Sequence, residues 1–158
     1  MIITKRTIAV LAILLTGGLI VVSTTFAAGS SSQRPARKSD YDKAVSAVKA
    51  GNYRTAIALL EKVVARDSRH ADGYNYLAFS HRKLGQFDIA MKFYRKALAI
   101  NPKHKGAHEY IGELYLQLGN LKQARAHLAR LDSICWLGCS EYTDLKAAIK
   151  RYEAGKGG

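Results

Sequence analysis

Residues 71–104 have the sequence ADGYNYLAFSHRKLGQFDIAMKFYRKALAINPKH, and the segments on either side repeat its pattern at an interval of 34 residues. The glycines Gly51, Gly85 and Gly119 keep this interval. Four further sets of residues keep it as well: Ala44, Ala78 and Gly112; Ala56, Ala90 and Ala124; Tyr53, Phe87 and Leu121; Leu60, Tyr94 and Leu128. A fixed period near this length predicts one supersecondary unit that is copied and stacked, so that each copy packs against its neighbours. Such stacks present a surface and rarely carry chemistry of their own.

Apolar residues recur at helical spacing through each copy, and no stretch alternates apolar and polar residues for long enough to indicate a strand. The spacing predicts helices at 40–50, 53–66, 71–84, 87–100, 105–118, 121–134 and 140–153. The first six helices form pairs, and a glycine between the two members of each pair can adopt the left-handed conformation that ends a helix. The fold class is therefore all-α.

Nine residues of the unit 71–104 form a spaced series of aromatic, Leu, small, Gly, aromatic, Ala, aromatic, Ala and Pro: Tyr74, Leu77, Ala78, Gly85, Phe87, Ala90, Tyr94, Ala97 and Pro102. This series resembles the tetratricopeptide repeat, and the units 105–138 and 37–70 match it at fewer positions. The resemblance implies a right-handed α-α superhelix of three helix pairs over residues 40–134. A Cys-bracketed turn at 135–139 follows, where the family pattern would place a proline at Trp136. The amphipathic helix 140–153, with Ser140 as its expected cap, is then predicted to cover the exposed end of the stack.

The resemblance also implies a concave groove lined by the first helix of each pair. The residues expected there are Tyr41, Val45, Val48, Lys49, Asp72, Asn75, Phe79, Arg82, Lys83, Glu109, Glu113, Leu116 and Gln117. This mixed lining suits an extended or helical peptide segment, with Tyr41 and Phe79 as anchors. The clamp with which some relatives hold C-terminal carboxylates is not reproduced, because Tyr41 and Val45 stand at two of its positions. The alternative is that several of these residues pack against a neighbouring helix or against the tether.

The N-terminal residues 1–28 have the pattern of an export signal, with a basic start at Lys5 and Arg6, an apolar run and small residues before a cut after Ala27. The alternative is an uncleaved anchor in the inner membrane, although the run is shorter than the ~20 residues that span a bilayer. Residues 29–39 are rich in Ser and basic residues and predict a flexible tether. The expected location is the bacterial periplasm. Residues 154–158 are predicted to be a disordered tail.

The chain carries a formal net charge of +13. Lys62, Lys96 and Arg130 recur at the repeat interval on the second helices, and they predict a basic convex face. Such a charge suggests an anionic partner or surface, with plain solubility as the alternative. Export argues against nucleic acid as the partner. Contact with a membrane is expected only through an uncleaved signal or through this basic face.

The two cysteines, Cys135 and Cys139, are expected to form a disulfide that fixes the angle between the third repeat and the capping helix. Thiol–disulfide exchange, metal or haem capture, unpaired thiols and pairing between chains are the alternatives, but the spacing departs from C-x-x-C and no further ligands complete a zinc site. His104 and His108 stand four residues apart and are interpreted as a solvated helix start, although two imidazoles there could hold a divalent ion. Scattered carboxylates, including Glu109, are interpreted as helix-surface charges. No cofactor and no metal are expected.

No catalytic signature is present, so the chain is predicted not to be an enzyme. The first hypothesis is a protein–protein interaction adaptor or scaffold of the cell envelope, which binds a peptide segment or a partner protein in the concave groove. The second is a structural envelope protein that binds anionic lipid or polymer through the basic convex face. The third is a redox or metal-handling protein that uses Cys135 and Cys139.

Overall fold

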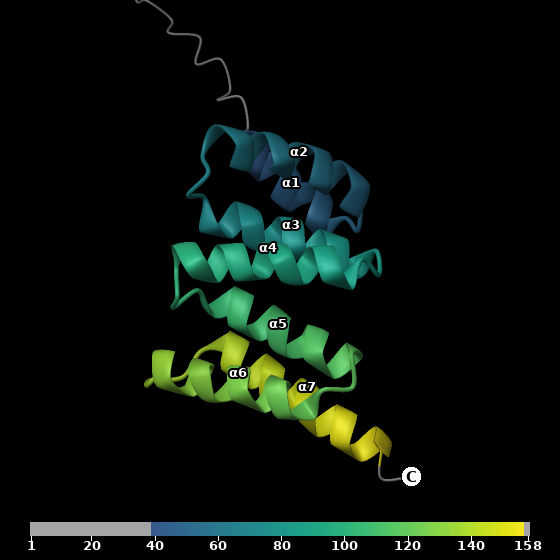
Figure 1. Ribbon diagram of the computed structural model, residues 1–158, viewed down its shortest axis with the longest axis vertical. Helices are drawn as coiled ribbons and strands as arrows, with labels where there is room; N and C mark the ends of the chain where they lie inside the picture. Colours follow the sequence, from purple (N-terminus) through teal and green to yellow (C-terminus); the bar gives the residue numbers. More distant parts are fainter. Residues whose placement is uncertain (1–38, 157–158) are drawn as a thin grey trace, which may run out of the picture. The chain divides into compact units, whose positions relative to one another are not determined.

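Three antiparallel helix hairpins and a closing helix make up the part of the chain that the structure describes, residues 39–156 of a computed structural model (Figure 1). The helices are α1 Asp40–Lys49, α2 Tyr53–Arg66, α3 Ala71–Lys83, α4 Phe87–Ile100, α5 Lys105–Gln117, α6 Leu121–Ile134 and α7 Ser140–Lys156. No strand occurs among these residues. The all-α prediction is confirmed. The predicted signal 1–28 and all but the last residue of the predicted tether 29–39 lie outside the described residues.

The hairpin turns have one shared geometry. Gly51, Gly85 and Gly119 have φ angles of 74°, 76° and 76°, in the left-handed region that a residue with a Cβ rarely adopts. Each glycine therefore ends the first helix of a pair and lets the chain reverse into the second. The agreement of the three angles explains why the repeat keeps glycine at this position.

Side chains cap the first helix of each pair. The Ser39 hydroxyl accepts a hydrogen bond from the Asp42 amide at 3.1 Å, and the Asp42 carboxylate accepts one from the Ser39 amide in return. The Nδ1 atom of His70 accepts from the Gly73 amide at 3.0 Å, and that of His104 accepts from the Ala107 amide at 3.1 Å. Two histidines one repeat apart thus satisfy amides that helix starts leave free.

Small residues sit where two helices of a hairpin approach. Ala44 and Ala78 on the first helices are fully buried, as are Ala56, Ala90 and Ala124 on the second helices. Large apolar residues fill the remaining space, and the fully buried ones include Leu60, Leu77, Tyr94, Leu131 and Leu145. The repeated small residues therefore set how closely the helices pack, as their spacing predicts.

The stack curves because its two layers of helices pack differently. The first helices contact one another in the order α1, α3, α5 and α7, whereas no contact joins α2 to α4 or α4 to α6 within the described residues. Helices that touch lie on the inside of a curve, and helices that splay lie on the outside. The first helices together with α7 therefore line the concave face of a superhelix, and α2, α4 and α6 form the convex face.

The closing helix α7 packs against α5 and α6. Leu145 and Ile149 are buried against these helices, and they belong to a cluster that contains Leu131 and Cys135. Gly112 makes room for this packing, because a Cβ atom built on it would lie 2.5 Å from a methyl carbon of Leu145. The C-terminal helix thus covers the end of the third hairpin.

Two predictions about this end of the chain are wrong. Ser140 does not cap α7, because it is the first helical residue. Its hydroxyl donates a hydrogen bond to the Glu141 carboxylate, and the Thr143 amide donates one to the Cys139 carbonyl. The predicted disordered tail from residue 154 is helical as far as Lys156, because α7 continues beyond the predicted end at 153. An amphipathic stripe shows where a helix is buried but not where its solvated last turn ends.

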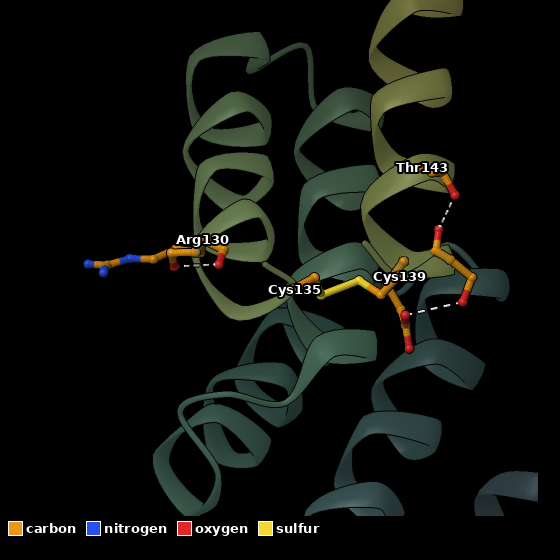
Figure 2. Close-up of a disulfide and its surroundings, with 7 residues drawn as sticks. Arg130, Cys135, Cys139 and Thr143 are labelled. Carbon is orange, nitrogen blue, oxygen red and sulfur yellow. Dashed lines mark hydrogen bonds between the residues drawn. A yellow bond between two sulfur atoms is a disulfide. The ribbon is translucent and has the colours of Figure 1, made fainter. Parts of the chain in front are cut away.

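A disulfide joins the end of α6 to the start of α7 (Figure 2). The Cα atoms of Cys135 and Cys139 are 5.7 Å apart, and Gly138 between them has a φ of 86°. Cys135 is buried in the same cluster as Leu131 and Leu145. Within residues 39–156, no helix is both long and apolar enough to cross a bilayer.

Candidate functional site

The thirteen predicted groove residues lie on the first helices, but they differ in exposure. The exposed ones are Lys49, Asp72, Lys83 and Gln117, and the half-buried ones are Tyr41, Val45, Phe79 and Glu113. The buried ones are Val48, Asn75, Arg82, Glu109 and Leu116. For Val48, Asn75 and Glu109, packing against a neighbouring helix is the better description.

Arg82 holds the middle of the concave face together. Its Nη2 donates to Oε2 of Glu113 at 2.7 Å, and its Nη1 donates to Oε1 of Gln117 at 3.4 Å. The guanidinium carbon lies 5.2 Å from the ring centre of Phe79 and 5.7 Å from that of Tyr110. Only 6% of the Arg82 side chain is exposed, so its guanidinium is largely shielded from water, whereas 28% of the Glu113 side chain is exposed. Arg82 thereby ties α3 to α5 and orients the two rings.

An open pocket of about 370 Å³ lies beside this arginine. Its lining residues come from α3, α5 and α7: Arg82, Glu113, Leu116, Gln117, Ala148 and Tyr152. The pocket combines an ion pair, an amide, an aliphatic side chain and an aromatic ring, which is the mixture that a peptide segment uses for binding. Four of the predicted groove residues therefore come together in one hollow.

Ala148 and Tyr152 belong to this pocket, and the sequence analysis missed them. The interval of 34 residues continues into α7, since Leu145 and Ile149 follow Ile111 and Tyr115 at that distance. α7 nevertheless begins at Ser140, one residue later than a further copy of α5 would begin. The two pocket residues of α7 stand 35 residues after Glu113 and Gln117, one more than the interval. The extended repeat, together with this late start, is the signal that could have found them.

Asp72 joins α3 to the start of α5. Its Oδ1 lies 2.9 Å from Nε2 of His104, whose Nδ1 already accepts the Ala107 amide. His104 is therefore committed at both nitrogens. His108 is buried too, with Nε2 directed at the Pro102 carbonyl at 3.0 Å and Nδ1 at 3.0 Å from Nδ1 of His127. The interpretation of His104 and His108 as a solvated helix start is wrong, because both are buried packing residues.

Metal ligands do not converge in the described part of the chain. No group of three or more His, Cys, Asp or Glu side chains there could hold an ion. His104 and His108 use their ring nitrogens for helix capping, an ion pair, a backbone carbonyl and a second histidine. Their spacing along the helix therefore serves packing.

Glu109 differs most from its predicted role. It is 9% exposed rather than a surface charge. Burial, and then repulsion from Glu113, Asp144 and Glu141, raises the pKa of its carboxyl from 4.5 to about 8. The carboxyl is therefore largely neutral near pH 7. It lies on the concave face among other carboxylates, where it avoids adding a further negative charge.

The three predicted convex residues, Lys62, Lys96 and Arg130, are exposed and lie on the second helices, away from the groove. Lys96 also borders an apolar hollow of about 440 Å³, where its Nζ lies 5.9 Å from the Tyr74 ring centre. Over their whole length, α2, α4 and α6 carry nine Lys or Arg and three Asp or Glu. The positive charge is thus concentrated on the convex helices.

Comparison with known proteins identifies the architecture. The family described as anaphase-promoting complex, cyclosome, subunit 3 matches residues 49–131, slightly more than half of the chain. This family and the similar solved structures share the tetratricopeptide-repeat fold. The chain belongs to the tetratricopeptide-repeat proteins. The resemblance of the unit 71–104 to this repeat is therefore confirmed. No curated protein sequence matches the chain significantly.

Solved tetratricopeptide-repeat structures superimpose on most of the chain. The type III secretion translocator chaperone SycD of Yersinia enterocolitica is 19% identical, with a TM-score of 0.65 over 74% of this chain and 91% of SycD. PcrH, solved in complex with the chaperone-binding region of PopD, is 18% identical, with a TM-score of 0.65 over 74% and 90%. The first repeat domain of Spaghetti (RPAP3), solved with an HSP90 peptide, is 22% identical, with a TM-score of 0.63 over 73% and 90%. At these identities the likeness shows the fold.

Proposed function

We propose that this protein is a non-enzymatic adaptor that binds a peptide segment of a partner protein in its concave groove. The observation that carries the proposal is the open pocket of about 370 Å³ between α3, α5 and α7, where Arg82 and Glu113 meet Leu116 and Tyr152. The pocket is built before a ligand arrives, because the ion pair with Glu113 and the contacts with the Phe79 and Tyr110 rings fix Arg82 in place. A preformed site avoids the cost of ordering side chains on binding.

The similar structures support a peptide partner. PcrH was solved with a region of PopD, the Spaghetti domain with an HSP90 peptide, and SycD with a peptide of the translocator YopD. The carboxylate clamp is absent at Tyr41 and Val45, so the partner need not present a chain end. An internal segment with an apolar anchor and a polar neighbour fits the lining of this pocket better.

The cell envelope is the proposed place of action. Its support is the export pattern of residues 1–28, with a basic start, an apolar run and a cut after Ala27. Mass measurement of the protein isolated from cells tests this point. A mass that begins at Ala28 supports release into the periplasm, a full-length mass in the membrane fraction supports the anchored form, and a full-length soluble protein contradicts export.

The groove is tested with a substitution that fills the pocket and leaves the fold intact. Arg82→Ala is unsuitable, because removing a buried arginine leaves Glu113 without its partner and destabilises the domain. Gln117 is exposed at the pocket, so Gln117→Trp occupies the space that a ligand would use. Gln123→Trp, at an exposed position of α6 on the convex side, is the matched control.

The probe is a peptide selected against the purified protein from a random displayed library. We expect Gln117→Trp to weaken its binding about ten-fold or more, as loss of a central contact does, and Gln123→Trp to leave it unchanged. Equal affinities for the two folded variants would place the binding site outside the groove and refute the proposal.

A second candidate function is supported by the distribution of charge. The nine basic and three acidic residues of α2, α4 and α6 would attract an anionic lipid or polymer surface to the convex side. This function requires that replacing Lys62 and Lys96 with Gln lowers binding to acidic vesicles at low salt. A redox or metal-handling function is less well supported, since a disulfide already occupies both thiols.

A further inference from the structure

The loop between α6 and α7 exposes the two most solvent-accessible large apolar side chains of the described residues. Trp136 is 83% exposed and Leu137 is 80% exposed. Elsewhere in the described part of the chain, the exposed large apolar residues are Leu84, Ile89 and Leu118, which are 37%, 42% and 52% exposed. An adjacent tryptophan and leucine in water are costly to solubility, and such pairs mark interaction sites.

The repeat architecture does not require apolar residues in this loop. One interval of 34 residues earlier, Pro102 and Lys103 occupy the corresponding positions between α4 and α5. Two intervals earlier, Ser68 and Arg69 occupy them between α2 and α3. The same connection is therefore made twice with exposed residues that are polar, charged or proline. Trp136 and Leu137 serve a purpose other than joining the helices.

The loop holds these two side chains outward in a fixed turn. Cys135 and Cys139 close it covalently (Figure 2), and the Gly138 amide donates to the Cys135 carbonyl at 2.6 Å. Cys135 is 8% exposed and packs with Leu131 and Leu145, so the base of the loop is anchored in the core. A closed turn on a buried base presents its tip without an ordering cost on docking.

Basic side chains lie near the base of the loop. Lys103 and Arg130 line one hollow of about 480 Å³ together with Ile134, the residue that precedes Cys135. The Arg130 side chain points away from the neighbouring helices into solvent (Figure 2). Asp132 and Glu141 stand close to the loop in the sequence, so the attraction to an anionic surface comes from the basic pair and from the positive net charge of the chain.

We propose that the loop 135–139 is a membrane-docking element, which inserts Trp136 and Leu137 into the headgroup layer of a bilayer that contains anionic lipid. Tryptophan prefers the membrane–water interface, where its ring is apolar and its N–H remains hydrated. Two inserted side chains alone give weak, reversible binding, and the phosphate contacts of Lys103 and Arg130 supply the second attraction that stable docking needs.

A second copy of the chain is the less suitable occupant. A stable protein interface buries at least about 1,200 Å², and two side chains on a five-residue loop provide only a small part of that area. A bilayer needs no complementary patch, so a small apolar tip with cations near the base of the loop is sufficient. This inference concerns a site apart from the concave groove, and it does not rest on the adaptor function.

Trp136 is the only tryptophan of the chain, so its emission reports the loop even when another segment attaches the protein to a membrane. The full chain is mixed with vesicles of phosphatidylcholine alone or of equal parts phosphatidylcholine and phosphatidylglycerol. With the anionic vesicles we expect a blue shift of the emission and quenching by brominated acyl chains. With phosphatidylcholine alone both effects should be much weaker.

The variants separate the loop from the rest of the surface. Leu137→Ser keeps the reporter and should lower the fraction of inserted Trp136 roughly ten-fold, because one of two inserted side chains is lost. Leu118→Ser, at another exposed leucine, is the matched control and should have no effect. The double variant Lys103→Gln, Arg130→Gln should weaken insertion into anionic vesicles only.

Three results would overturn the inference. If the chain sediments with vesicles while Trp136 stays unquenched with the emission of a water-exposed ring, another surface binds the membrane. If the emission shifts in buffer alone and the shift grows with protein concentration, a second copy covers the tip. If Leu137→Ser inserts Trp136 as well as the unmodified chain and the control Leu118→Ser do, the loop does not carry the binding.

Discussion

Replacing Gly112 with alanine tests the close approach of α5 and α7. A Cβ atom at this position would lie 2.5 Å and 2.7 Å from the two methyl carbons of Leu145 and 3.1 Å from its Cγ. Unstrained carbon–carbon contacts are about 3.5–4.0 Å. Rotation about the last side-chain bond of Leu145 moves the methyl carbons but leaves Cγ in place. The fully buried Leu145 also has little room to turn, so the added methyl group must push the helices apart.

Two opposing contributions determine how much Gly112→Ala changes the free energy of unfolding. Overpacking a buried contact costs about 1–3 kcal/mol, and alanine is better than glycine inside a helix by about 1 kcal/mol. We therefore expect Gly112→Ala to lower the free energy of unfolding by up to about 2 kcal/mol. Leu145→Ala alone should cost about 2–5 kcal/mol through the cavity that it leaves. In that background the crowding is gone, and Gly112→Ala should become stabilising by about 1 kcal/mol.

Urea unfolding of the four proteins in this cycle, followed by far-ultraviolet circular dichroism, measures the coupling. Fluorescence is unsuitable, because Trp136 is already exposed in the folded state. The expected coupling between the two substitutions is about 1–3 kcal/mol, equal to the relieved overpacking. If Gly112→Ala changes stability by the same amount in both backgrounds, within about 0.5 kcal/mol, the close contact does not exist and the packing of α7 described here is wrong.

Three further predictions concern titration and the disulfide. Burial raises the pKa of Glu109 to about 8, so the folded state holds this proton more tightly than the unfolded state, and the stability of the domain should fall as the pH rises from about 4.5 to 8. In thermal unfolding, Glu109→Gln should remove this pH dependence and stabilise the domain by roughly 1–3 kcal/mol above pH 8. Burial lowers the pKa of His127 to about 4 and also lowers the pKa of His108, so the stability of the domain should fall as the pH drops below about 6.5. An NMR titration of His127 with a midpoint near 6.5 would contradict the burial of this side chain. Replacing Cys135 and Cys139 with Ser should cost about 2 kcal/mol, the loop-closure value for so short a ring, and labelling of native protein by a thiol reagent would show instead that the cysteines are unpaired.

The helices were predictable because their signals are local. Gly51, Gly85 and Gly119 end the first helices, and the small residues mark where two helices meet. Each signal depends on residues close in the chain and occurs in each of the three repeats. The position of the disulfide was predictable for the same reason, since Gly138 lets a short segment turn.

The groove was less predictable, because burial there depends on the next repeat. Position in the helix predicts that Asn75, Arg82 and Glu109 face inward, but the curvature of the stack determines which of them the neighbouring helix covers. The ion pair between Arg82 and Glu113 spans 31 residues, and nothing in the spacing of either unit specifies it.

Because each helix contacts only its near neighbours, local unfolding should begin at one end of the stack. α1 is the shortest helix of the described residues, with 10 residues, and it contacts only α2 and α3. At the other end, the disulfide ties α7 to α6. Amide protons of α1 should therefore exchange with solvent first, while those of the central helices are retained longest. A ligand seated over α3, α5 and α7 would slow exchange in these helices and leave the first helix free to fray.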